Sequence, residues 1–302
     1  MNTTEKVVLV TGASSGIGKA TAALLAGKGW KVYAAARRVE AMRELAGLGV
    51  VALAMDVTEE RQRREAVEEI LRREGRIDAL VNNAGYGSYG ALEDVSDEEA
   101  RRQFDVNVFG LMALTRLVLP SMRSQGRGRI VNVGSVGGRL VATPMGGWYH
   151  ATKFALEALS DSLRLEVRPF GIEVVLIEPG GVATEWSGIA GRGLLVASGT
   201  GAYAKAAKDM ADGFEAIGRG KGPVTLAAPE VIAKVIAHAL ETGRPKNRYA
   251  APCHAKIILF LHWLLPDRCF DAMIMKQLAS LGDPGDKCRC SFTCRKRRGQ
   301  TL

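Results

Sequence analysis

Short apolar segments alternate with amphipathic helical segments along most of the chain. The apolar segments are continuous and rich in β-branched residues, which is typical of strands buried on both faces of a parallel sheet. Strands are predicted at residues 6–12, 30–36, 50–56, 76–85, 128–135, 171–180 and 247–252. Helices are predicted at about residues 16–28, from 38, at 59–74, 97–125, around Tyr149 and at 229–241. The alternation predicts an α/β fold, a doubly wound parallel sheet of about seven strands with helices on both faces.

One long segment, residues 184–221, has no strand pattern, only weak helical signals, and many Gly and Ala residues. It follows directly on the sixth predicted strand, and ligands of open α/β sheets bind at the carboxyl ends of the strands. Connections of this length are commonly functional lids. We therefore expect a lid over a ligand site. Its candidate apolar lining residues are Ile189, Leu194, Leu195, Val196 and Met210.

The composition is sufficient for a large hydrophobic core, and most of the excess positive charge lies at the C-terminal end. The chain has 302 residues, of which 47% are hydrophobic, and a formal net charge of +9. Six of its 41 basic residues lie in 287–302, where no acidic residue occurs, so residues 1–286 carry 35 basic and 32 acidic groups. A body with this balance has no obvious face for tracking phosphates, so we expect no nucleic-acid partner.

The C-terminal part differs in composition from the rest. All five cysteines lie at or after Cys253, and the tail 282–302 is predicted to be disordered and to bind no metal, because it lacks a fourth ligand at a zinc-like spacing.

The apolar run 257–265 is too short to span a membrane. We expect one catalytic domain at 1–255, and an extension at 256–281 that caps the site, packs against a subunit or touches a membrane surface. The chain reaches its first strand without a signal peptide, which predicts a cytoplasmic protein, with membrane-peripheral contact as an alternative.

The first strand runs into "TGASSGIG", with glycines at positions 12, 16 and 18. Between a strand and a helix, such a loop brings backbone N–H groups close to a pyrophosphate at the positive end of the helix. This context predicts a dinucleotide site in a Rossmann-type domain.

The end of the second strand indicates which dinucleotide is preferred. An acidic residue normally accepts the ribose 2′-hydroxyl of NAD at this place, but here Arg37 and Arg38 follow the strand. Two guanidinium groups suit a 2′-phosphate, which would repel a carboxylate. Glu40 could still serve a ribose, so NADP(H) is predicted over NAD(H) without excluding the latter.

Tyr149 and Lys153 stand four residues apart in "GGWYHATKFALEAL" and share one face of a helix. The spacing alone also fits an ordinary amphipathic helix with a solvated lysine. The order of six motifs along the chain favours a functional pair over an ordinary helix. The motifs are "TGASSGIG", "NNAG" at 82–85, Asn107 in "NVFG", Ser135 in "NVGS", "YHATK" at 149–153 and "PGGVAT" at 179–184. Together they resemble the classical short-chain dehydrogenase/reductase family over about residues 5–250.

The resemblance implies a role for four side chains. Tyr149 would be the general acid/base, and Lys153 would favour its phenolate and hold the nicotinamide ribose. Ser135 would hydrogen-bond the substrate oxygen, and Asn107 would hold a water that links Lys153 to solvent. Trp148 and His150 lie outside the family pattern and remain unassigned.

The resemblance also implies the cofactor contacts. Arg37 and Arg38 would flank the adenosine ribose, and Asp56 is also a candidate cap for the following helix. The remaining implied cofactor residues are Gly12, Ser14, Gly16, Ile17, Gly18, Val57, Asn83, Ala84, Gly85, Pro179, Gly180, Val182 and Thr184, besides Tyr149 and Lys153.

Within the family, the motifs look most like the hydroxysteroid, retinol and acyl-dihydroxyacetone-phosphate reductase branch, which implies a bulky apolar alcohol or ketone as substrate. A homodimer or homotetramer is expected by analogy. Four other functions stay open: a non-catalytic dinucleotide sensor, an NAD-dependent dehydrogenase of a small alcohol, a nucleotide-sugar epimerase, and nucleic-acid binding through the basic tail. The four-residue catalytic set disfavours the sensor, and the glycine spacing disfavours the epimerase.

Overall fold

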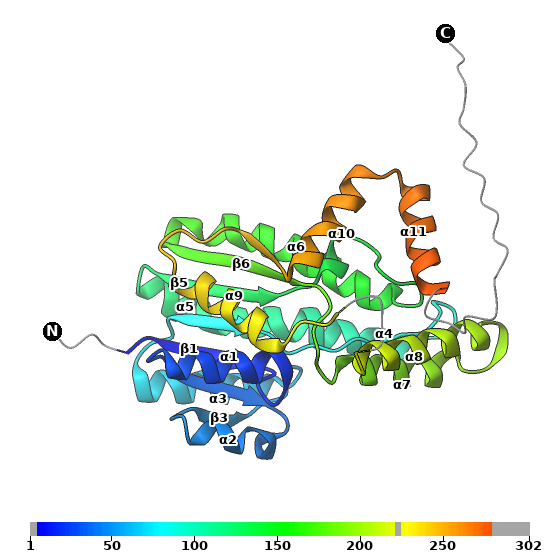
Figure 1. Cartoon of the computed structure of the whole chain (residues 1–302). Helices are drawn as coiled ribbons and strands as arrows, with labels where there is room; N and C mark the ends of the chain where they lie inside the picture. The colour runs from blue at the N-terminus through cyan, green and yellow to red at the C-terminus, as the bar shows by residue number, and fades with distance from the viewer. Residues whose placement is uncertain (1–4, 221–224, 280–302) are drawn as a thin grey trace, which may run out of the picture.

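The computed structural model of the protein describes residues 5–220 and 225–279 and is built around a seven-stranded parallel sheet (Figure 1). The strand order is β3-β2-β1-β4-β5-β6-β7, and every neighbouring pair is parallel. The strands are β1 (Val7–Thr11), β2 (Lys31–Ala36), β3 (Val51–Ala54), β4 (Ala79–Asn82), β5 (Gly128–Val133), β6 (Ile172–Pro179) and β7 (Arg248–Ala251). The predicted doubly wound sheet is confirmed.

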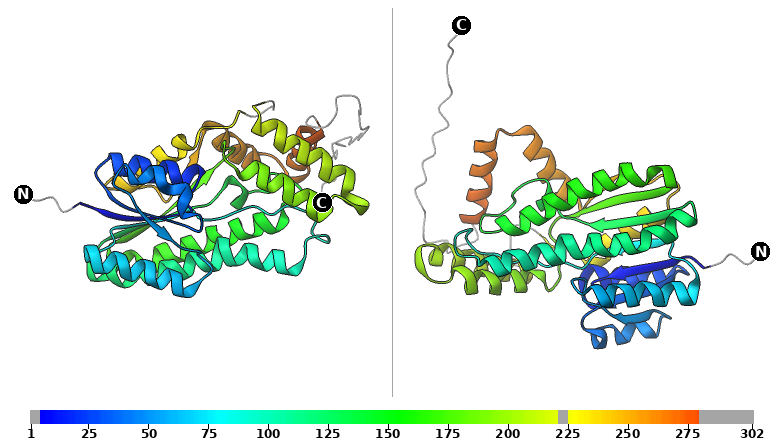
Figure 2. Two further views of the ribbon diagram at one scale, coloured as in Figure 1. Left: turned by 90° about the horizontal axis from the view of Figure 1, so that it is seen from below. Right: turned by 180° about the vertical axis from the view of Figure 1, so that it is seen from behind.

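Helices cover both faces of the sheet (Figure 2). One face carries α1 (Gly16–Gly27) and α9 (Pro229–Glu241), and the other carries α3 (Glu60–Glu74), α5 (Leu111–Ser124) and α6 (Gly147–Val167). The strand order reverses between β1 and β4, and a crevice at such a switch point is where open α/β sheets bind ligands.

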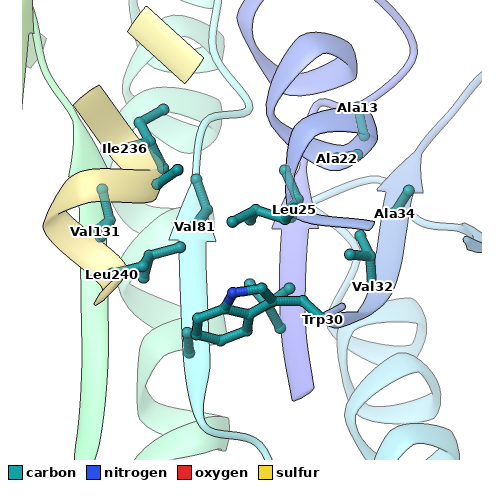
Figure 3. Packing of buried hydrophobic residues seen from close by; sticks show 14 of the residues in the cluster. Ala13, Ala22, Leu25, Trp30, Val32, Ala34, Val81, Val131, Ile236 and Leu240 are labelled. Atoms are coloured by element: carbon teal, nitrogen blue, oxygen red, sulfur yellow. The ribbon is translucent and has the colours of Figure 1, made fainter. Parts of the chain in front are cut away.

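The alternation of side chains along β1 divides the core in two. Val8 and Val10 point to the face where Leu25 and Ile236 pack (Figure 3), whereas Leu9 points to the opposite face. Successive side chains of a strand face opposite ways, so an all-apolar strand fills both layers at once. This is the physical reason why continuous apolar runs predicted a covered parallel sheet.

Two predicted helices differ in detail from the structure. The helix expected from residue 38 is a 3₁₀ turn, Val39–Met42, followed by the short α2 (Arg43–Ala46). The helix expected at 97–125 consists of α4 (Asp97–Phe104), a π-helical turn at Asp105–Gly110, and α5. A Cβ at Gly110 would lie 2.4 Å from the Val57 carbonyl oxygen, so the wide turn brings the backbone against the loop after β3.

The combined run Asp97–Ser124 has the length and hydropathy of a membrane span by composition alone. It lies along the sheet, however, and Leu114, Val118 and Met122 are fully buried in the core. Packing against the sheet accounts for its apolar face.

Two further helix pairs lie near the carboxyl ends of the strands (Figure 1). The first is α7 (Trp186–Ser198) with α8 (Ala204–Gly218), which form most of the predicted lid segment. The second is α10 (Cys253–Leu264) with α11 (Asp267–Ala279). The tail predicted to be disordered, residues 282–302, lies outside the described residues.

Candidate active site

Three elements bring the four predicted catalytic side chains to the carboxyl edge of the sheet. Tyr149 and Lys153 lie in the first two turns of α6, Ser135 follows β5, and Asn107 lies in the π-helical turn. All four are at the switch-point side of the sheet where a dinucleotide loop also opens, so the structure gathers them in one place.

The Tyr149 ring is enclosed by other rings. Its side chain is only 9% exposed, and its centroid lies 5.8 Å from that of Tyr89 and 5.7 Å from that of Trp186. Burial raises the pKa of the phenol, and a hydrogen bond with Ser135 opposes this rise. Desolvation of the phenolate is the larger of these two effects, so the phenol is held in its protonated form.

Lys153 is buried beside this ring with a single hydrogen bond. The residue is 8% exposed, and its Nζ donates to the Val133 carbonyl oxygen at 3.0 Å and lies 5.9 Å from the centre of the Tyr149 ring. Burial lowers the pKa of the amine to about 8, although the nearby Glu157 carboxylate favours the charged form. A buried ammonium with one acceptor retains donors for a ligand.

Asn107 uses both ends of its amide to fix the adjacent loop. Its Oδ1 accepts from the Tyr86 N–H at 3.0 Å, and its Nδ2 donates to the Tyr86 carbonyl oxygen at 2.9 Å and to Thr152 Oγ1 at 3.1 Å. A Cβ at Gly85 would lie 3.0 Å from Oδ1 and 3.8 Å from Lys153 Nζ. A glycine at position 85 therefore leaves this space next to the amine free.

Ser135 lies in a turn that a buried histidine supports. Its Oγ accepts from the Gly137 N–H at 3.0 Å, and His150 Nδ1 lies 2.9 Å from the Gly137 carbonyl oxygen. A Cβ at Gly137 would approach His150 Nδ1 to 2.8 Å. Burial lowers the pKa of His150, so the ring is held neutral as a support of the turn. This accounts for one of the two unassigned neighbours, and the other, Trp148, packs edge-on against Phe104.

The glycine-rich turn has the shape that a pyrophosphate needs. Gly12 and Gly16 have φ values of +65° and +52°, and a Cβ at Gly18 would lie 2.4 Å from the Gly12 carbonyl oxygen. The first turn of α1 has no acidic residue, so its positive end remains available for an anion. Ser14, Gly16 and Thr184 line a hollow of about 490 Å³ here. The residues present fit a dinucleotide.

Other predicted cofactor residues hold this turn in place. Asn83 Nδ2 donates to the Thr11 carbonyl oxygen at 2.9 Å, and the Ala84 N–H donates to Thr11 Oγ1 at 3.0 Å. Ile17 packs against the core under α1. These contacts join the ends of β1 and β4, the two strands that flank the switch point.

Arg37 and Arg38 are exposed at the end of β2. Arg37 Nη1 lies 3.9 Å from Asp56 Oδ2, and Arg38 Nη2 lies 3.0 Å from Glu185 Oε2. Asp56 Oδ1 also accepts from the Thr58 N–H at 2.9 Å within its own loop, but the N-cap of α3 is Glu59, so Asp56 does not cap the following helix as suggested. The Val57 carbonyl oxygen accepts a hydrogen bond from the buried Arg63 guanidinium. The Val57 side chain packs in the core. Glu40, the alternative ribose partner, pairs with Arg43 instead.

The loop after β6 is held by a histidine that the sequence did not reveal. The Gly181 N–H donates to His254 Nε2 at 2.9 Å, and a Cβ at Gly180 would lie 2.7 Å from the same nitrogen. Val182 forms a β-bridge with Ala227, which fixes the other end of the loop after Pro179. The histidine contact joins residues 73 positions apart, so no local pattern could have predicted it.

Helices α7 and α8 of the predicted lid segment form a cover over Tyr149, although not with all the expected residues. Leu194 and Met210 are buried in a cluster with Tyr149, as the lining prediction required. Leu195 and Val196, the latter 89% exposed, point to solvent, as does Ile189, so these three predicted lining residues are wrong. Consecutive residues of a helix, such as Leu194, Leu195 and Val196, cannot all face the same side, and α7 buries only its inner face.

Three aromatic residues of the site were missed. Tyr89, Trp186 and Phe214 form edge-to-face contacts with ring centroids 5.4 to 5.8 Å apart around Tyr149. Tyr89 is fully buried, and burial raises the pKa of its phenol, so it is neutral beside the catalytic candidate. Tyr89, four residues after "NNAG", and Trp186, two residues after "PGGVAT", lay near motifs that could have drawn attention to them, whereas Phe214 did not.

Comparison with known proteins agrees with this arrangement. The family described as short chain dehydrogenase matches residues 6–191. A 3-ketodihydrosphingosine reductase of Bacteroides thetaiotaomicron is 44% identical over 58% of this chain, a match that spans 63% of the relative's own length. An NADPH-dependent 3-dehydrocapnine reductase of Ornithobacterium rhinotracheale is 34% identical over 91% of this chain and 98% of its own. A solved short-chain dehydrogenase from Streptomyces avermitilis superposes with a TM-score of 0.73 at 34% identity, covering 90% of this chain and 96% of that one.

Proposed function

The chain belongs to the short-chain dehydrogenase family, and we propose that it is an NADP(H)-dependent oxidoreductase that interconverts a ketone and an alcohol on a hydrophobic, lipid-like substrate. The observation that carries the proposal is the grouping of four side chains: Ser135 and Lys153 lie against Tyr149, and Asn107 and Lys153 both border the space at Gly85.

The side chains divide the acid/base work among them. A bound nicotinamide supplies or accepts the hydride, and Tyr149 gives its phenolic proton to the substrate oxygen or takes one from it. Ser135, whose hydroxyl already hydrogen-bonds Tyr149, orients that oxygen. Lys153 stabilises the phenolate after proton loss, and its remaining donors suit ribose hydroxyl groups. Asn107 fixes the loop that keeps the space beside Lys153 open.

The covering of the site supports an apolar substrate. Tyr149 lies under Tyr89, Trp186, Leu194 and Met210, so a substrate that reaches the phenol displaces apolar side chains and must offer apolar surface in exchange. The names of two relatives point to long-chain amino-ketone lipids. We place a lipid ketone of this kind first among the substrates, ahead of the steroid, retinoid and acyl-dihydroxyacetone-phosphate classes.

The preference for NADP(H) rests on Arg37 and Arg38, which stand exposed at the end of β2 where a ribose 2′-phosphate would lie. Of the acidic groups nearby, Glu40 is paired with Arg43 and Asp56 caps its own loop. Both carboxylates therefore already have partners within the protein.

A homodimer or homotetramer is part of the proposal. Phe109 in the π-helical turn and Phe154 and Leu165 on α6 are exposed apolar side chains on the long helices that the family analogy uses for association. Sedimentation of the purified protein tests this part independently of activity.

Steady-state oxidation of NADPH tests the function. The substrates are 3-ketodihydrosphingosine, a steroid ketone, retinal, an acyl-dihydroxyacetone phosphate and a small aldehyde. We expect the long-chain ketone to be reduced best, and Tyr149→Phe to lower kcat/KM by about 10²- to 10⁴-fold, the usual contribution of a general acid. Tyr249→Phe is the matched control, since its hydroxyl only accepts from the Lys246 N–H. Undiminished activity in Tyr149→Phe would remove the proposed mechanism.

A further inference from the structure

Helix α10 presents an apolar face to solvent. Ile257, Phe260 and Leu264 are 53%, 54% and 55% exposed, and Trp263 beside them is 78% exposed. The positions i, i+3 and i+7 lie on one side of a helix, and the Phe260 and Trp263 rings are 5.9 Å apart. We call these four side chains the α10 apolar face. Contiguous exposed apolar groups of this size on a soluble domain mark an interaction surface.

The other side of α10 is packed, so the direction of this face is fixed. Ile258 and Leu259 pack against a buried cluster that includes Phe270 and Ile274 of α11. The His262 ring meets the Phe270 ring edge-on at 4.9 Å. Because α11 and Leu140 occupy the inner side, α10 cannot turn its apolar face inward without losing this cluster. Figure 1 shows the pair standing out from the sheet.

The charges near this face favour an anionic partner. Residues 287–302 carry six basic and no acidic groups, and only seven residues, with a reach of about 25 Å, separate Lys287 from Ala279 at the end of α11. A partner must therefore accept aromatic side chains at one place and many cations nearby. An anionic lipid surface meets both demands, since Trp and Phe lie at the headgroup level while Lys and Arg attract acidic lipids.

A second copy of the chain fits these charges poorly. In a twofold interface each partner presents the same patch, and the two copies would carry the same net charge of +9 each, which disfavours their association. We propose that α10 docks the protein on an anionic bilayer surface through its apolar face, with the basic tail adding electrostatic attraction. The inference stands apart from the proposed reaction, although it would bring the lid and a membrane-dissolved substrate to one surface.

Flotation with vesicles tests the proposal on the full chain without substrate. We expect binding to vesicles of phosphatidylglycerol and phosphatidylcholine, and much weaker binding to phosphatidylcholine alone or at high salt. Phe260→Ser with Trp263→Ser should lower the partition coefficient by about 10-fold or more. Replacing Arg295, Lys296, Arg297 and Arg298 by Gln should lower it by about 100-fold.

Leu48→Ser is the matched control, because Leu48 is also an exposed apolar residue but lies away from α10. It should leave vesicle binding unchanged, and all variants should keep the circular dichroism spectrum of the parent. No binding to anionic vesicles, or binding that the Phe260 and Trp263 substitutions leave intact, would overturn the proposal. Loss of a dimer in that double variant, with no effect on vesicles, would assign the face to a second copy instead.

Discussion

Replacing Lys153 by Met should stabilise the nucleotide-free protein while abolishing catalysis. The amine is buried with one hydrogen bond, and its pKa falls from 10.5 to about 8. A lowered pKa means that the folded state disfavours the charged form. Above pH 10.5 the amine is neutral in both states and costs the unfolding free energy nothing. As the pH falls through about 8 the folded protein must take up the proton, and the stability present at high pH is lost.

The magnitude can be worked from the shift in pKa. At 1.36 kcal/mol per pKa unit, holding Lys153 charged at pH 7 costs about 3 kcal/mol, of which about 1 kcal/mol remains at pH 9.5. The substitution also removes the hydrogen bond to the Val133 carbonyl oxygen, worth about 1 kcal/mol. Lys153→Met should therefore be more stable than the parent by about 2 kcal/mol at pH 7 and about equally stable at pH 9.5.

Urea denaturation at the two pH values measures this difference. Lys208→Met is the control, because Lys208 is 70% exposed in a helical pair with Asp212, and it should change the unfolding free energy by less than about 0.5 kcal/mol at both. A less stable Lys153→Met at pH 7, or a difference that does not shrink toward pH 9.5, would refute the reasoning. Such a result would mean that contacts beyond the single carbonyl offset the cost of burying the amine.

Two further variants test the nucleotide side. Arg37→Asp should lower kcat/KM for NADPH by about 10- to 100-fold through loss of a charge-assisted phosphate contact, with little change for NADH, and an unaltered ratio of the two would refute the assignment. Glu185→Gln removes the competing ion pair with Arg38, worth about 0.2–1 kcal/mol at an exposed site, so fluorescence titration should show NADPH binding about 1.5- to 5-fold tighter. Weaker binding in Glu185→Gln would show that the pair holds Arg38 in place for the phosphate.

The strands, the glycine turn and the neighbourhood of Tyr149 could be predicted because each depends on local pattern. A strand buried on two faces needs a continuous apolar run, and a tight turn needs residues such as Gly12 that tolerate positive φ. Helix spacing placed Tyr149 and Lys153 on one side. The parallel sheet then brings the loops at the carboxyl ends of its strands together at one edge.

The features that could not be predicted depend on contacts between distant residues. His254 reaches Gly181 across 73 positions, and Glu185 reaches Arg38 across 147. The Gly- and Ala-rich lid has a weak helical pattern, and its two helices gain an orientation only by packing on Tyr89 and on each other. The burial of Tyr149 could not be predicted either, because the rings that cover it come from separate segments of the chain.

Three consecutive residues, 184–186, contact the glycine turn, Arg38 after β2 and the ring of Tyr149. Thr184 lines the hollow at the glycine turn, Glu185 pairs with Arg38, and Trp186 lies against the Tyr149 ring. Because they follow one another along the backbone, none can move far without the other two. A change in the Glu185–Arg38 pair therefore bears on the first turn of α7, where the covering indole begins. Through this short segment the glycine turn, Arg38 and the cover of Tyr149 are mechanically linked.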